Sequence, residues 1–107
     1  RLRREDRRSL WLAYATAGKI VLDPPTAIER ARHQIALMRP TARGQARLWI
    51  DEWSALLDGP LETLLATLTD PSLRGREMRQ NSPFAGLLSD EERATIIAQW
   101  RNHSSTP

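Results

Sequence analysis

The chain contains no cysteine, and only one lysine, one phenylalanine and one tyrosine occur among its 107 residues. Without thiols it can form no disulfide and offers no thiolate ligand to a metal ion. Its apolar runs are short, such as Ile20-Val21-Leu22, whereas a membrane-spanning helix needs about 20 apolar residues. We therefore expect a cytoplasmic protein that does not cross a membrane.

Recognisable catalytic and cofactor motifs are also missing. The sequence has no P-loop, no Gly-rich phosphate loop and no Ser-His-Asp arrangement. Its two histidines, His33 and His103, have no partner at a metal-ligand spacing. Carboxylates occur as sequence neighbours, as in Asp51-Glu52, and neighbouring side chains on a helix point about 100° apart. The sequence therefore predicts a protein that is not an enzyme and uses no cofactor and no metal.

What the chain does have is an uneven charge. The net charge of the chain is +3, and residues 1–8 account for it with five arginines against Glu5 and Asp6. The remaining residues are balanced, which argues against a nucleic-acid-binding surface over the body of the domain. The chain starts at Arg1 rather than at a methionine, so we expect the natural N-terminus to lie upstream.

Proline and glycine divide the chain into pieces whose apolar residues recur at helical spacing, and no stretch alternates with a period of two. The fold class predicted is therefore all-α, a compact bundle of five to six helices with no sheet. We expect a single helical domain over residues 1–101 and a flexible polar tail over residues 102–107. The predicted helices cover approximately residues 4–21, 24–38, 45–57, 60–68, 70–80 and 89–101.

The predicted core consists of the apolar stripes of these helices. Four tryptophans could also line a ligand pocket, but helical spacing such as that of Trp49 and Trp53 favours a place in the core. The residues expected in the core are Leu10, Tyr14, Ile28, Ile35, Trp49, Trp53, Leu56, Leu64, Leu68, Ile97 and Trp100.

A first candidate site is the arginine-rich start of the chain. These side chains could contact nucleic-acid phosphates, although no aromatic residue is interleaved with them and no recognition helix is evident. The alternative is a solvated beginning of the first helix. The candidate nucleic-acid-binding residues are Arg1, Arg3, Arg4, Arg7 and Arg8.

The second candidate is the segment of residues 79–93, RQNSPFAGLLSDEER. It combines a helix stop at Asn81-Ser82-Pro83 with a capping box formed by Ser89 and Glu92. Arg79, Asn81, Ser82 and Phe84 are candidate partner-binding residues, because Phe84 lies in the turn between two helices. The alternative is that Phe84 folds under Leu87 and Leu88 and seals the end of the bundle.

Three stretches carry a family resemblance: RREDRRSL at 3–10, WIDEWSALLDGP at 49–60 and RQNSPFAGLLSDEER at 79–93. On these the chain resembles a family of small all-helical proteins from high-GC bacteria, which are antitoxin-like or transcriptional regulators. The resemblance implies the antitoxin or regulatory half of a toxin–antitoxin-like gene pair. Some such proteins carry a helix-turn-helix segment, and this sequence shows no convincing one.

Together these observations predict a non-catalytic protein-interaction domain, antitoxin-like, that neutralises a protein partner such as a toxin by direct binding. Two alternatives remain open. One is a DNA-binding transcriptional regulator that uses its arginine-rich N-terminal end. The other is a homodimerisation module of a larger regulator, that is, a homo-oligomer.

Overall fold

The computed structural model describes residues 3–104. Within this range the chain is all-α and has no strand, which confirms the predicted fold class. The elements are α1 (Arg4–Leu22), α2 (Pro24–Met38), a short 3-10 helix η1 (Arg39–Thr41), α3 (Gln45–Leu57), α4 (Leu61–Leu68), α5 (Leu73–Gln80) and α6 (Asp90–Ser104).

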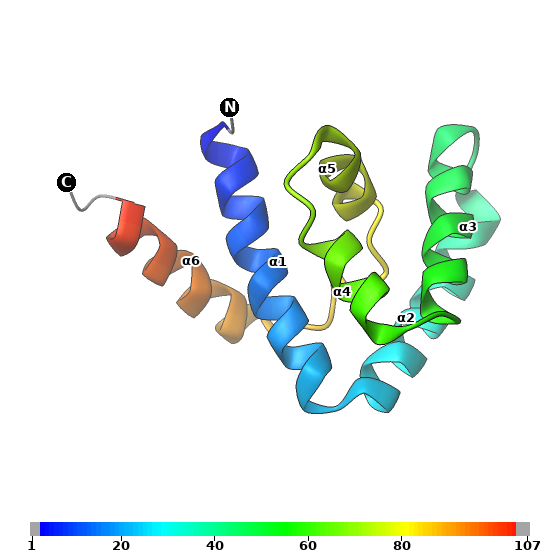
Figure 1. The fold of residues 1–107 in the computed structure, drawn as a ribbon, viewed down its shortest axis with the longest axis horizontal. Coiled ribbons are helices and arrows are strands. Elements are labelled where there is room, and N and C mark those ends of the chain that lie inside the picture. Colours follow the sequence, from blue (N-terminus) through cyan, green and yellow to red (C-terminus); the bar gives the residue numbers. More distant parts are fainter. Residues whose placement is uncertain (1–2, 105–107) are drawn as a thin grey trace.

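Helix α1 is central to the arrangement (Figure 1). It contacts α2, α4, α5 and α6, while α3 packs on α2 and α4. Helix α6, drawn in orange and red, runs beside α1, so the last helix of the chain lies against the first. The segment between α5 and α6 therefore leads the chain from one neighbour of α1 to another.

Side-chain caps determine where several helices begin. The carboxylate of Asp23 accepts a 3.5 Å hydrogen bond from the Thr26 N–H, and Pro24 occupies the first turn, so α2 begins at residue 24 as predicted. The predicted capping box of α6 is also present. The Ser89 N–H donates to the Glu92 carboxylate at 2.8 Å, and the Glu92 N–H donates to Ser89 Oγ at 3.0 Å.

The predicted start of α5 was wrong. We expected this helix to begin near residue 70, but α5 begins at Leu73 and its N-cap is Ser72, whose Oγ accepts from the Gly75 N–H at 3.2 Å. The Asp70 carboxylate instead accepts the Ser72 N–H at 2.9 Å, and this bond lowers the pKa of Asp70. Asp70 therefore closes a turn that precedes the helix.

The end of α6 also differs from the expectation. The predicted tail begins at residue 102, whereas α6 continues through Ser104. The basic residues Arg101 and His103 lie in the last turn of the helix, where positive charge interacts favourably with the helix dipole. The remainder of the predicted tail, residues 105–107, lies outside the described residues.

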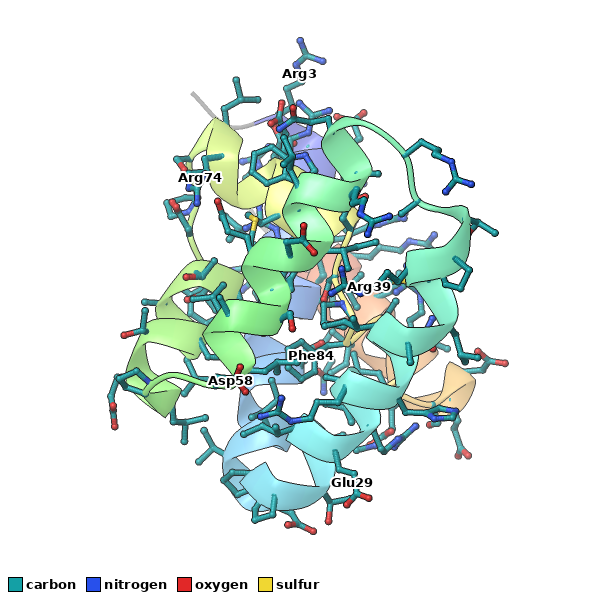
Figure 2. The ribbon with its side chains drawn as sticks, turned by 90° about the vertical axis from the view of Figure 1, so that its right-hand side faces the viewer. Arg3, Glu29, Arg39, Asp58, Arg74 and Phe84 are labelled. Carbon is teal, nitrogen blue, oxygen red and sulfur yellow. The ribbon has the colours of Figure 1, made fainter. Side chains whose placement is uncertain are left out.

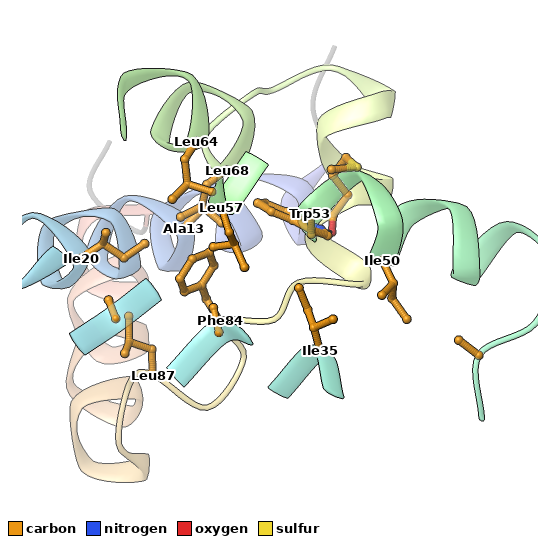
Figure 3. Packing of buried hydrophobic residues seen from close by; sticks show 14 residues of the cluster. Ala13, Ile20, Ile35, Ile50, Trp53, Leu57, Leu64, Leu68, Phe84 and Leu87 are labelled. Carbon is orange, nitrogen blue, oxygen red and sulfur yellow. The ribbon is translucent and has the colours of Figure 1, made fainter. Parts of the chain in front are cut away.

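One contiguous cluster of buried side chains forms the core (Figure 3). Of the predicted core residues, Ile35, Trp53, Leu64, Leu68 and Trp100 are buried. Partly buried are Leu10, Ile28, Trp49, Leu56 and Ile97. The cluster consists of Ala13, Ile20, Ala27, Ala31, Ile35, Ala42, Ile50, Trp53, Leu57, Leu64, Leu68, Met78, Phe84 and Leu87.

Tyr14 was placed wrongly in the core, because its side chain is 62% exposed. The buried face of α1 runs through Ala13, Thr16 and Ile20, so the position before Tyr14 is buried in its place. Thr16 is compatible with burial because its hydroxyl donates a 2.9 Å hydrogen bond to the Leu12 carbonyl oxygen. Hydrophobicity alone predicts that Tyr14 is buried in preference to a small or polar residue. In the packed structure the small Ala13 and the polar Thr16 are buried instead.

Candidate functional site

A hollow of about 530 Å³ lies between α1, α6 and the segment that connects α5 to α6. Arginines from three helices, α1, α5 and α6, surround it, and we call it the arginine groove. Its basic residues are Arg4, Arg8, Arg79, Arg93 and Arg101, and a single carboxylate, that of Glu5, joins them. Packing of the last helix against the first therefore collects positive charge that is dispersed in the sequence.

The two clusters predicted from the sequence meet at this groove. Arg4 and Arg8 of the N-terminal cluster line it together with Arg79, Ser82 and Phe84 of the second segment. The tertiary structure thus brings together two sets that are about 70 residues apart, as shown by the 2.9 Å hydrogen bond between Arg79 Nε and Ser9 Oγ, whose sequence separation is 70.

Other predicted site residues lie elsewhere. Arg3 is exposed at the N-terminal end of α1 (Figure 2), and Arg7 lines a neighbouring hollow. The side chain of Asn81 donates a 3.1 Å hydrogen bond to the Glu77 carbonyl oxygen at the end of α5, so it has a structural role there. Arg1 lies outside the described residues.

Sequence reasoning missed the contribution of α6. Arg93 and Arg101 are eight positions apart, so on an ideal helix they lie within about 80° of each other on the same side. The sequence therefore does indicate that these two arginines share one side of the helix. Its significance depends on α6 packing against α1, which no local pattern reveals.

The groove arginines do not form ion pairs with carboxylates of the described residues. Within residues 3–104 there are five ion pairs, and none of them uses an arginine of the groove. These pairs are Lys19–Glu92, Arg32–Asp58, Arg39–Asp51, Arg74–Glu52 and Arg76–Asp6. Arg39 and Arg74 lie on the α3 side of the molecule, in the view turned by 90° (Figure 2).

Arg79 is the most constrained arginine of the groove. Its Nε donates to Ser9 Oγ at 2.9 Å and its Nη1 donates to the Asp70 carbonyl oxygen at 2.5 Å. Its Nη2 is buried and has no hydrogen-bond partner among the described residues. Burial lowers the pKa of Arg79, and the nearby carboxylates of Asp70 and Asp6 oppose that shift. Arg79 therefore places a fixed positive charge at the inner wall of the groove.

Apolar side chains complete the lining. Arg4 lies over the Trp100 ring, with its guanidinium carbon 4.8 Å from the ring centroid. Leu12 and Leu88 are half-buried and contribute further apolar surface. The groove thus combines cationic walls with an apolar lining, a combination that suits a ligand with both anionic and apolar groups.

Phe84 belongs to the core rather than to the open surface. It is 3% exposed and meets the Trp53 ring edge-to-face, with centroids 6.1 Å apart and planes at 81°. Figure 3 shows its ring among the buried residues, and Leu87 is buried with it. Phe84 is therefore a residue of the central core and not an exposed side chain that a partner could contact directly.

A second basic hollow, of about 800 Å³, lies between α2 and α3 and contains Arg32, Arg39, Arg43 and Arg47. Most of these arginines already form ion pairs or hydrogen bonds within the protein. Arg32 and Arg39 are paired with carboxylates at 2.8 and 2.5 Å, and Arg43 donates to backbone carbonyl oxygens. This hollow is therefore a weaker candidate than the arginine groove.

Other kinds of site find little support in residues 3–104. No group of three or more potential ligand side chains there could hold a metal ion. His33 is exposed, and the ring of His103 lies 5.4 Å from that of Trp11. None of the helices in this range has the length and apolar character that crossing a membrane requires.

No protein-family model, curated protein or solved structure matches this chain.

Proposed function

We propose that this chain is a non-catalytic binding domain that neutralises a protein partner by direct contact, in the manner of an antitoxin. The observation that carries the proposal is the arginine groove. Its five arginines form no ion pair within the described residues, yet they surround an apolar lining. Unpaired positive charge of this kind is complementary to an acidic surface on a partner.

The physical logic is that of a protein–protein interface. Arginine and tryptophan are enriched where partners bind, because they combine a large contact area with directional hydrogen bonds. Arg8, Arg93 and Arg101 are exposed, so they can attract an acidic partner and orient it during the encounter. The resemblance of residues 3–10, 49–60 and 79–93 to antitoxin-like proteins points in the same direction.

The test is co-purification of the tagged full-length protein from its host, followed by reconstitution with the partner that is found. Charge reversal with Arg8→Glu plus Arg93→Glu should weaken the complex by at least about a hundredfold and restore the activity of the partner. The matched control is Arg43→Glu plus Arg47→Glu, which makes the same charge change between α2 and α3. Equal losses in both double variants would contradict the assignment to the groove.

A second candidate function is nucleic-acid binding through Arg3, Arg4, Arg7 and Arg8, which are all exposed. The observation that favours it is that Arg3 and Arg7 are charged and do not line the groove. In this case duplex DNA should bind with an affinity that falls steeply with salt. Arg3→Ala plus Arg7→Ala should reduce the log–log salt slope by about 2. Absence of binding at low salt would exclude this function for the chain.

A further inference from the structure

We infer that the arginine groove binds an acidic amphipathic α-helix of the partner protein, which lies between α1 and α6 with its apolar face against Leu12 and Leu88. The inference rests on the proposed function and goes further, because it specifies the chemistry and the conformation of the segment that is recognised.

The spacing of the charges indicates an elongated ligand. Arg93 and Arg101 are eight residues apart on α6, which separates them by about 12 Å along the helix axis. Arg4 and Arg8 face them from α1, about 6 Å apart along that axis. A single phosphate or carboxylate cannot reach all of these side chains. A second helix with acidic residues seven or eight positions apart repeats the same 12 Å spacing.

The lining favours a protein segment over a nucleic acid. Single-stranded nucleic acids bind by stacking their bases on open aromatic rings. Trp100 is only 5% exposed and Arg4 lies over its ring, while Phe84 is 3% exposed. What the groove offers beside its arginines is aliphatic surface, from Leu12 and Leu88, and leucine- or phenylalanine-like side chains cover such surface well.

The conformation follows from the backbone of the domain. Residues 3–104 contain no strand, so they present no sheet edge with which an extended peptide could pair. An extended segment would leave the backbone groups that face the apolar lining without strand partners, whereas a helix pairs its N–H and C=O groups internally. Helix-in-groove recognition is accordingly the mode that the geometry favours.

Glu5 provides a test of whether the ligand of the groove is negatively charged. It is the one carboxylate that lines the groove, it is exposed, and it forms no ion pair within the described residues. It should repel an acidic helix, so Glu5→Gln is expected to tighten binding by about threefold at low salt. Because a loss of folding cannot increase affinity, this variant keeps the inference testable even if arginine variants prove unstable.

The experiment uses labelled peptides of about 18 residues, long enough to form a helix in isolation, and measures their binding to the whole chain by fluorescence anisotropy. The first peptide places Glu at i and i+7 and Leu at i+3 and i+4. The second has the same composition with its residues scrambled around the helix. The third probe is single-stranded DNA of equal charge.

The first peptide should bind at least about tenfold more tightly than the scrambled one, and Arg93→Glu and Arg101→Glu should each weaken it by about fivefold. Arg47→Glu is the matched control and should leave its affinity unchanged. The inference is overturned if the DNA binds the groove more tightly than the first peptide, if both peptides bind equally, or if neither binds. The peptides could fail to bind while the complex with the natural partner is still weakened by charge reversal at Arg8 and Arg93. That result would reject the helical ligand and leave the proposed function intact.

Discussion

The indole N–H of Trp53 donates a 2.8 Å hydrogen bond to the carbonyl oxygen of Met78. Both side chains are completely buried, and the bond joins α3 to the last turn of α5, just before the segment that leads to the groove. Trp53 thus satisfies a buried backbone acceptor while its ring packs on Phe84.

Replacing Trp53 by phenylalanine should therefore be strongly destabilising. Trp53→Phe removes one of the two donors to the Met78 carbonyl oxygen, which keeps the Asn81 N–H at 3.1 Å, and it leaves a small cavity. The two effects together should cost about 2–3 kcal/mol in the free energy of unfolding. Urea denaturation monitored by circular dichroism measures this. Trp49→Phe is the control, since Trp49 is only partly buried, and a comparable loss there would contradict the role assigned to Trp53.

A second prediction concerns pH and Glu92. The Lys19 ammonium group, at 2.6 Å, and then the Ser89 N–H hold the pKa of the Glu92 carboxyl at about 2, below its ordinary value of 4.5. Since the pKa is lower in the folded chain, the ionised carboxylate stabilises the fold above pH 4.5, and this contribution is lost as the pH falls toward 2.

Glu92→Gln should accordingly reduce the loss of stability between about pH 5 and pH 2, and the difference between variant and parent should be largest near neutral pH. Thermal unfolding at several pH values measures it. Glu91→Gln serves as the control, because Glu91 lies in the same turn of α6 and has no ion pair in the described part of the chain. Identical pH profiles for parent and Glu92→Gln would refute the prediction.

Two glycines should respond to alanine in opposite directions. A Cβ atom on Gly75 would lie 2.0 Å from the Asp70 carbonyl oxygen, because α5 packs directly on the backbone that precedes it. Gly75→Ala should therefore cost about 2–3 kcal/mol. Gly18, in α1, has nothing within 4 Å of such an atom, so Gly18→Ala should stabilise the protein by about 0.5–1 kcal/mol. Chemical denaturation measures the free energy of unfolding of both variants. Destabilisation by Gly18→Ala would contradict the packing described for α1.

Arg79 should not tolerate lysine. A lysine ammonium group cannot reach both Ser9 Oγ and the Asp70 carbonyl oxygen in the geometry of the guanidinium group. Arg79→Lys is expected to lower the free energy of unfolding by about 1–3 kcal/mol. Arg8→Lys, at an exposed position of the same groove, should change it by less than about 0.5 kcal/mol. Equal stabilities for the two variants would show that the contacts of Arg79 contribute little.

Much of the helical architecture could be predicted from local chemistry. The bounds of α2 and α3 were predicted correctly. Asp23-Pro24 starts α2 and Asp58-Gly59-Pro60 ends α3, and both effects are confined to a few neighbouring residues. The start of α5 was not predicted correctly, because Asp70 and Ser72 both have capping side chains and either could have been the N-cap. Tyr14 was wrongly expected in the core because the face of α1 that is buried contains Ala13 and Thr16, which are small or polar. Which face of α1 is buried depends on the helices that pack against it.

Local chemistry specifies most of the helix bounds of this protein, because caps, prolines and apolar spacing act over one or two turns. The burial of Phe84 in the core and the meeting of Arg8, Arg79 and Arg93 in one groove depend on how the helices pack together. The reason is that these relationships depend on how α6 returns to lie on α1. That packing is set by contacts between residues far apart in the chain, which no local pattern records.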